Sequence, residues 1–211
     1  MWKNRAIRYA AVATAAIALT GCSDASESGD AALDRFLCEE SDLGGAFLGL
    51  ASGSFSQTDL GGLGRDPEAR KLEYREAGMQ RGRFIFWKER LPRPPFDPPV
   101  NVVCQVLVFE TDAQAAAWVA GLDADSADLA ASGIIWLPDG ERLTEEAAPI
   151  AGTRSFRIAA QEGPARATLF ATYVAEGSVV WSVFAGDRDG TVTREYVESI
   201  IQRKRERLTG Q

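Results

Sequence analysis

Side chains that could carry out chemistry are few in this chain, which has no histidine and three cysteines among 211 residues. The lack of histidine excludes Ser-His and Cys-His mechanisms and every imidazole metal site. The segment Asp187-Arg188-Asp189-Gly190 suggests a calcium loop. An EF-hand aligned on Gly190 would, however, place Ala185 and Tyr196 at its first and twelfth ligand positions. We therefore expect a solvated acidic loop there, with no metal or cofactor.

Other catalytic motifs also fail. The glycines near residues 61–64 form neither a dinucleotide fingerprint nor a P-loop, and no G-x-S-x-G elbow is present. A pair of carboxylates for hydrolysis is a spatial feature, and with 30 acidic residues the sequence neither points to one nor excludes it. We expect no enzymatic activity, and a hydrolase that uses carboxylates alone is the least favoured alternative.

Aromatic side chains are the one feature that could form a ligand site. They could line a groove for an apolar or sugar-like ligand, or simply fill the core between a sheet and its helices. The Phe96 candidate stands apart, because it lies within the proline-rich loop 92–99. The candidates are Phe84, Phe86, Trp87, Phe96, Trp136 and Trp181.

The N-terminal segment has the pattern of an export signal. Lys3, Arg5 and Arg8 precede an uncharged apolar run over residues 10–19. This run is shorter than the roughly 20 residues that a transmembrane helix needs, and its proportions are those of a signal peptide. Residues 1–21 are therefore predicted to be a cleaved signal.

The end of this segment, Leu19-Thr20-Gly21-Cys22, resembles the lipobox of bacterial lipoproteins. The resemblance implies that Cys22 is lipidated and becomes the new N-terminus, so that the membrane is a partner through the lipid anchor. Loss of the three basic signal residues would change the net charge from −7 to −10. Such an acidic protein is not expected to bind nucleic acid. Residues 22–31 are small, polar and acidic, and are predicted to be a flexible tether.

The two remaining cysteines are Cys38 and Cys104. Export would place them in an oxidising compartment, where an even pair typically forms a disulfide. Their 66-residue separation makes closure of this loop worth about 4 kcal/mol on chain-entropy grounds. The alternative is two separate buried thiols; a catalytic cysteine lacks a histidine base.

Strand and helix patterns come in the order helix, strands, helix, strands, helix. Residues 83–88 and 101–110 are predicted strands, and the second is apolar on both faces, as in a central strand. Thr111 begins a capping box for a helix to about residue 122. Four further strands follow, over residues 134–137, 154–159, 167–175 and 178–185, with a tight turn near Gly177, and then a helix from about residue 193 to 208. Residues 57–80 look mostly like loop.

This order predicts an α+β fold, an antiparallel sheet with helices packed on one face, in a single domain over residues 32–211. Together with the two cysteines, it resembles the uncharacterised two-cysteine extracytoplasmic lipoproteins of high-GC bacteria. The resemblance implies an extracytoplasmic location in the cell membrane, or in the outer membrane of a cell that has one. We expect a binding or envelope-associated domain whose partner is an unidentified protein; the alternative is a carrier that holds a small apolar ligand in a cavity between sheet and helices.

Overall fold

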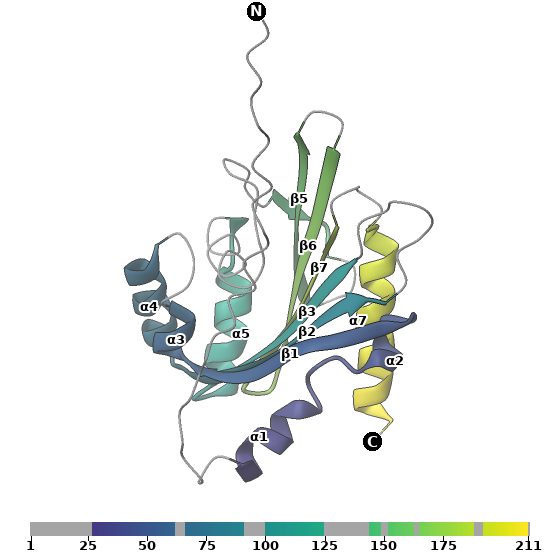
Figure 1. Cartoon of the computed structure of the whole chain (residues 1–211). Helices are drawn as coiled ribbons and strands as arrows, with labels where there is room; N and C mark the ends of the chain where they lie inside the picture. The colour runs from purple at the N-terminus through teal and green to yellow at the C-terminus, as the bar shows by residue number, and fades with distance from the viewer. Residues whose placement is uncertain are drawn as a thin grey trace, which may run out of the picture.

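The computed structural model describes residues 27–61, 66–90, 100–124, 144–148, 152–162, 165–187 and 192–210. Its strands form one seven-stranded sheet in the order β1-β2-β3-β7-β6-β5-β4, and every neighbouring pair is antiparallel (Figure 1). The strands are β1 (Phe47–Ser56), β2 (Met79–Glu89), β3 (Asn101–Phe109), β4 (Thr144–Glu146), β5 (Thr153–Glu162), β6 (Ala165–Glu176) and β7 (Val179–Asp187). The helices are α1 (Glu27–Asp34), α2 (Glu40–Leu43), α3 (Gln57–Gly61), α4 (Pro67–Glu76), α5 (Asp112–Gly121) and α7 (Arg194–Thr209).

The sheet consists of two meanders joined at its centre. Strands β1, β2 and β3 form the first, β4 to β7 form the second, and β3 pairs with β7 between them. The predicted central strand is confirmed, since β3 is buried along nearly its whole length. The tight turn between β6 and β7 is also confirmed, with Gly177 at a φ of 60°.

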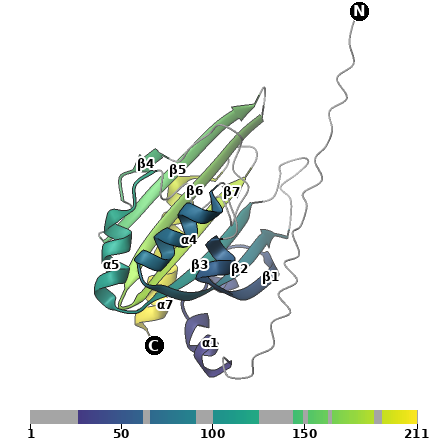
Figure 2. The same ribbon diagram turned by 90° about the vertical axis from the view of Figure 1, so that its left-hand side faces the viewer.

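Helices cover both faces of the sheet, so the prediction of helices on one face needs correction. On one face, α3, α4 and α5 enclose a core that contains Trp118, Tyr173 and Phe184. On the other face, α1, α2 and α7 enclose a second core around Trp181 and Ile200 (Figures 1 and 2). Because β3 and β7 are apolar on both sides, one layer of helices would leave half of this surface in water.

Two helices occupy the segment that the sequence pattern suggested was mostly loop. Asp66 caps α4 by accepting a hydrogen bond from the Ala69 backbone N–H at 3.1 Å, and Pro67 stands at the first helical position. Most side chains of α4 are polar or charged, and the helix buries only two of them, those of Arg70 and Tyr74. Its apolar stripe is therefore too weak to be recognised from periodicity.

Other boundaries follow the sequence more closely. Thr111 caps α5 as predicted, accepting from the Gln114 backbone N–H at 3.2 Å. The final helix α7 begins after its cap, Thr193. The first helix begins at Glu27, inside the segment predicted to be a tether, and the remainder of that segment lies outside the described residues.

A substitution at Gly82 of β2 would test how tightly the first meander is packed. A Cβ there would overlap the ring of Phe55 and lie 2.5 Å from the Val106 carbonyl oxygen. Gly82→Ala is therefore expected to lower the free energy of unfolding by about 1–3 kcal/mol. The control is Gly121→Ala at the end of α5, where a Cβ meets nothing within 4 Å. Denaturant unfolding would measure both; equal stabilities of the two variants would contradict the packing described.

Candidate functional site

The N-terminal segment folds back across the sheet face that carries α7. We call residues 33–46 the N-terminal hook. Its apolar side chains enter the second core, where Leu33, Phe36, Leu37 and Leu43 are all buried. Gly44 ends α2 at a φ of 69°, a left-handed conformation that glycine adopts without strain. The hook therefore extends the layer of α7 toward the β1 edge of the sheet.

A disulfide fixes the hook to the middle of the sheet. Cys38 and Cys104 are bonded, as predicted, and their Cα atoms are 5.7 Å apart. Both residues are buried, with Cys104 on the central strand β3. The bond links the hook to a strand 66 residues away, so it restricts the unfolded chain strongly.

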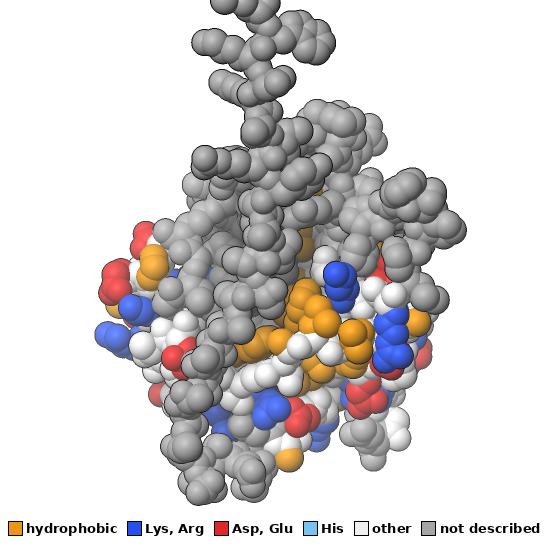
Figure 3. All heavy atoms as spheres, in the orientation of Figure 1, with side chains coloured by type: hydrophobic (Ala, Val, Ile, Leu, Met, Phe, Trp, Pro, Cys, Tyr) orange, Lys and Arg blue, Asp and Glu red, His pale blue; other side chains and the backbone are white. Residues whose placement is uncertain are grey.

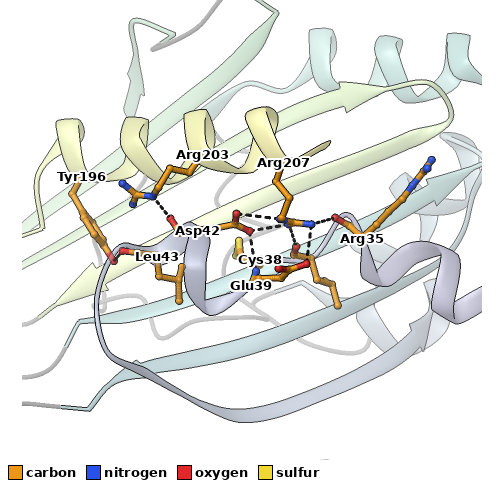
Figure 4. Close-up of a disulfide and its surroundings, with 10 residues drawn as sticks. Arg35, Cys38, Glu39, Asp42, Leu43, Tyr196, Arg203 and Arg207 are labelled. Atoms are coloured by element: carbon orange, nitrogen blue, oxygen red, sulfur yellow. Dashed lines mark hydrogen bonds and ion pairs between the residues drawn. A yellow bond between two sulfur atoms is a disulfide. The ribbon is translucent and has the colours of Figure 1, made fainter. Parts of the chain in front are cut away.

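A buried ion pair fixes the hook to α7 (Figure 4). Arg207 donates from Nε and Nη2 to the two carboxylate oxygens of Asp42, at 3.1 and 2.8 Å. Asp42 is only 2% exposed and also accepts from the Glu39 backbone N–H. The same guanidinium donates to the carbonyl oxygens of Arg35 and Leu37, at 2.9 and 2.8 Å. This bidentate geometry satisfies both charges at once, which a buried pair requires.

Electrostatics around Arg207 favour the charged form. Partial burial acts to lower its pKa, but the hydrogen bonds and charge of Asp42 and the charge of Glu39 outweigh this, so the pKa of Arg207 is raised. Two neighbours on α7 reinforce the contact: Arg203 donates to the Asp42 carbonyl at 2.7 Å and Tyr196 to the Leu43 carbonyl at 3.3 Å (Figure 4). The basic residues at the end of α7 thus have specific partners in the hook.

Lys204 lies beneath the Asp42–Arg207 ion pair, in apolar surroundings. It is completely buried, its ammonium sits 4.2 Å from the centroid of the Trp181 ring, and among the described residues it has no hydrogen-bond partner. Burial lowers the pKa of Lys204 to about 7, although the charges of Asp42 and Glu176 act to raise it. Trp181 in turn donates its indole N–H to Glu176 at 3.2 Å.

An open groove lies between the hook and the first two strands. Its volume is about 540 Å³, and it is lined by hook residues and by β1 and β2. Trp87 and Ile85 form its apolar floor, and Ser52 belongs to β1. The groove acids have cationic partners: Asp34 lies 2.9 Å from Arg83, Glu39 lies 3.1 Å from Arg207, and Glu40 lies 3.8 Å from Arg90. Charged groups around an aromatic floor suit a ligand with both polar and apolar parts.

The opposite side of the same strands is apolar. Phe84 and Phe86 of β2 face α3–α5 and are only partly buried. Leu48 and Leu50 of β1 are 49% and 48% exposed, among the largest exposed hydrophobic side chains. Figure 3 shows hydrophobic side chains gathered along this end of the sheet, with Lys and Arg side chains beside them. The β1–β2 end therefore presents a charged groove on one face and an apolar surface on the other.

The structure does not bring the predicted aromatic residues into one groove. Phe84 and Phe86 lie on one face of β2, while Trp87 lies on the other face and lines the groove. Trp181 is fully buried, because β7 lies at the centre of the sheet beneath α7. Phe96, Trp136 and Cys22 lie outside the described residues. The sequence analysis did not identify Arg83 or the groove acids Asp34, Glu39 and Glu40, because they come together only in the folded chain.

A second polar cluster lies on the other face, under α4. Arg70 is buried and donates to the Tyr74 hydroxyl at 3.3 Å. Burial raises the pKa of Glu73, and the nearby Asp123 raises it further, although Trp118 and Arg70 act against this. Tyr74 and Trp118 are in ring contact with centroids 6.2 Å apart, so the cluster holds α4 against α5. Within the described ranges, no three acidic or cysteine side chains gather as a metal ion would need.

Comparison with known proteins identifies the fold. No family model matches the chain, and no curated protein matches it. Among solved structures, the extracellular domain of PknH from Mycobacterium tuberculosis is similar, with a TM-score of 0.51 and 14% sequence identity. The match covers 82% of this chain and 94% of that chain. The TM-score shows that the two proteins share a fold. Among the described helices, none combines the length and apolar character needed to cross a bilayer.

Neutralising Asp42 would test how much the Asp42–Arg207 ion pair stabilises the domain. Asp42→Asn keeps the shape of the side chain but removes the buried charge opposite Arg207, leaving the exposed Glu39 as its carboxylate partner, so it should lower the free energy of unfolding by about 3 kcal/mol. Glu39→Gln is the matched control, because Glu39 contacts the same guanidinium with a side chain that is 57% exposed. It should cost less than about 1 kcal/mol. Urea unfolding at neutral pH would compare them, and similar losses would show that burial of the pair is unimportant.

Lys204 predicts an unusual dependence of stability on pH. Its pKa is depressed to about 7 in the folded protein, so between pH 7 and about 10 the unfolded chain holds more protons. The free energy of unfolding should therefore rise with pH in this window, on the order of 2 kcal/mol between pH 7 and 9.

Lys204→Met should remove this rise and stabilise the protein at pH 7, because a buried cation is replaced by an apolar chain of similar length. Lys88→Met is the control, since Lys88 is exposed, and it should keep the wild-type slope. Denaturant unfolding measured at several pH values would decide; a slope unchanged by Lys204→Met would refute the assignment.

Proposed function

We propose that this protein is a lipid-anchored extracytoplasmic binding domain without catalytic activity. The observation that carries the location is the Cys38–Cys104 disulfide, because disulfides persist in oxidising compartments and are rare in the cytosol. The signal-like N-terminal segment and the lipobox at Cys22 support the same location. The shared fold with an extracellular domain is consistent with it.

The β1–β2 end of the sheet supports a binding role. It combines the groove floored by Trp87 with the exposed leucines Leu48 and Leu50. Exposed apolar surface next to charged groups is typical of protein interaction sites. The groove acids are held in ion pairs, which supports binding rather than acid–base catalysis. We therefore favour a protein partner over a small apolar ligand, for which a cavity lined mainly by apolar groups would be suited.

The acidic character of the chain supports the choice of partner. The net charge of −7, or −10 after loss of the predicted signal, disfavours contact with nucleic acid or with anionic lipid headgroups. Attachment to the membrane would then depend on the acyl chains of Cys22, since two chains suffice without a basic patch.

The anchor is tested at Cys22. Wild-type protein isolated from native membranes should carry acyl chains on an N-terminal Cys22, detected by mass spectrometry. Cys22→Ala should remain unprocessed or leave the membrane fraction, because no thiol is available for lipid. Ser23→Ala, which keeps that thiol, should behave like wild type. Normal processing and full membrane retention of Cys22→Ala would refute the anchor.

A further inference from the structure

The two edges of the sheet differ in a way that bears on binding. The β4 edge is three residues long and carries Glu145 and Glu146, features that block pairing with another strand. The β1 edge has ten residues, FLGLASGSFS, with no charged residue and no proline. Within the described part of the chain, no strand pairs with its outer side. A register shift at Leu50 interrupts the pairing of this edge with β2.

The hydrogen bonds of β2 show which peptide groups of β1 face outward. The Glu89 N–H points to the β3 side, where it donates to Val100, and the Arg90 N–H points to the β1 side, where it donates to Ala46. Alternation along β2 then directs the peptide groups of Trp87 and Ile85 away from β1. Their partners in the register are Gly49 and Ser52. The backbone groups of these two residues therefore face outward.

The ends of this edge are closed by acids. The Phe47 N–H, which faces outward by the same alternation, is bonded to the Glu40 carboxylate at 3.3 Å. At the other end, the Ser56 N–H is bonded to Asp59 at 2.9 Å. The stretch between them exposes backbone donors and acceptors over a length that an extended segment of about six residues would match.

A strand placed on this edge would have two unlike sides. On one side its residues would extend the apolar surface of Phe84, Phe86 and Leu48; alternation places Leu48 on this side, because its neighbour Phe47 is buried on the other. On the groove side they would lie near Ser52 and the hook, where Asp34, Glu39 and Glu40 are each paired with an arginine, in a chain whose net charge is −7. Alternating apolar and basic residues would complement both sides.

We propose that β1 binds an extended segment of a partner protein as an eighth strand, with apolar residues on the α3–α5 side and basic residues on the groove side. This inference rests on the proposed binding function and specifies its mode. Main-chain hydrogen bonds to Gly49 and Ser52 provide affinity, and the alternating side chains provide specificity. A second copy of the chain fits less well, because both copies carry a net charge of −7 or more negative.

The probe is a fluorescent ten-residue peptide of alternating valine and lysine, titrated into the full chain in detergent micelles. Ser52→Pro removes the outward N–H and leaves the β1–β2 hydrogen bonds in place, since the Ser52–Ile85 pair is not hydrogen-bonded. It should weaken peptide binding about tenfold or more, the effect of losing one or two net hydrogen bonds. Ser52→Ala keeps the N–H and should bind within about twofold of wild type.

Peptide controls separate strand pairing from charge attraction. The same peptide with a methyl group on every backbone nitrogen keeps its charge but cannot donate hydrogen bonds along either edge, and it should not bind. A valine–glutamate peptide should bind at least about tenfold more weakly than the lysine peptide. Thermal unfolding of Ser52→Pro would verify that the variant is folded.

Three results would overturn strand addition. One is equal affinity of wild type and Ser52→Pro for the lysine peptide, and another is full binding of the N-methylated peptide. The third is a dimer without peptide that dissociates in Ser52→Pro, seen by analytical ultracentrifugation, which would assign the edge to a second copy. Peptide binding that is insensitive to Ser52→Pro and weakened in Asp34→Asn would place the partner in the groove. The binding function would then stand without strand addition.

Discussion

The attachment of the N-terminal hook to the body of the domain supports most of what lies at the β1–β2 end. Two interactions hold the hook, and they stabilise the fold by different mechanisms. The Cys38–Cys104 bond acts mainly on the unfolded chain, whose freedom it reduces. The Asp42–Arg207 pair acts in the folded state, where each buried charge would be costly without the other. Residues 34–40 of the hook form one wall of the groove.

The basic residues at the end of α7 show how local and tertiary effects combine. Cations near a helix C-terminus are favoured by the helix dipole. In the folded protein, however, Arg203 and Arg207 also donate to hook carbonyls, and Lys204 turns inward over Trp181. Three neighbouring basic residues therefore have different roles, because successive positions on a helix point in different directions. We expect the buried Lys204 to destabilise the domain at neutral pH, whereas Arg203 and Arg207 attach α7 to the hook.

The two edges of the sheet differ from each other, and different helices pack on its two faces. The second meander ends in a short acidic strand, and the first ends in a long neutral one. Glycines at 49 and 53 of β1 lie against the rings of Trp87 and Phe84, at 3.4 and 3.3 Å from an ideal Cβ, so the aromatic groups shield backbone that glycine would otherwise expose. An unblocked edge strand can pair with other chains and aggregate unless it has a partner. Its preservation beside the groove is consistent with a binding role.

Features of the fold that depend on short-range patterns are visible in the amino-acid sequence. Four features could be predicted from neighbouring residues: the continuous apolar run of β3, the Thr111 cap, the hairpin turn at Gly177 and the amphipathic α7. The disulfide could be predicted because one pairing is left once Cys22 is set aside as the predicted site of lipidation. The weakly apolar α4 could not, since its few buried side chains form no clear stripe.

Tertiary structure alone decided which strand lies at an edge, which face each helix covers and which charges meet. Trp87 and Trp181 look alike in the sequence, yet one lines the groove and the other is fully buried, because β2 lies next to an edge strand and β7 at the centre. Asp42 and Arg207 are 165 residues apart, and nothing local marks them as partners. Contacts between distant segments depend on strand order and register, which are set by the packing of the whole chain.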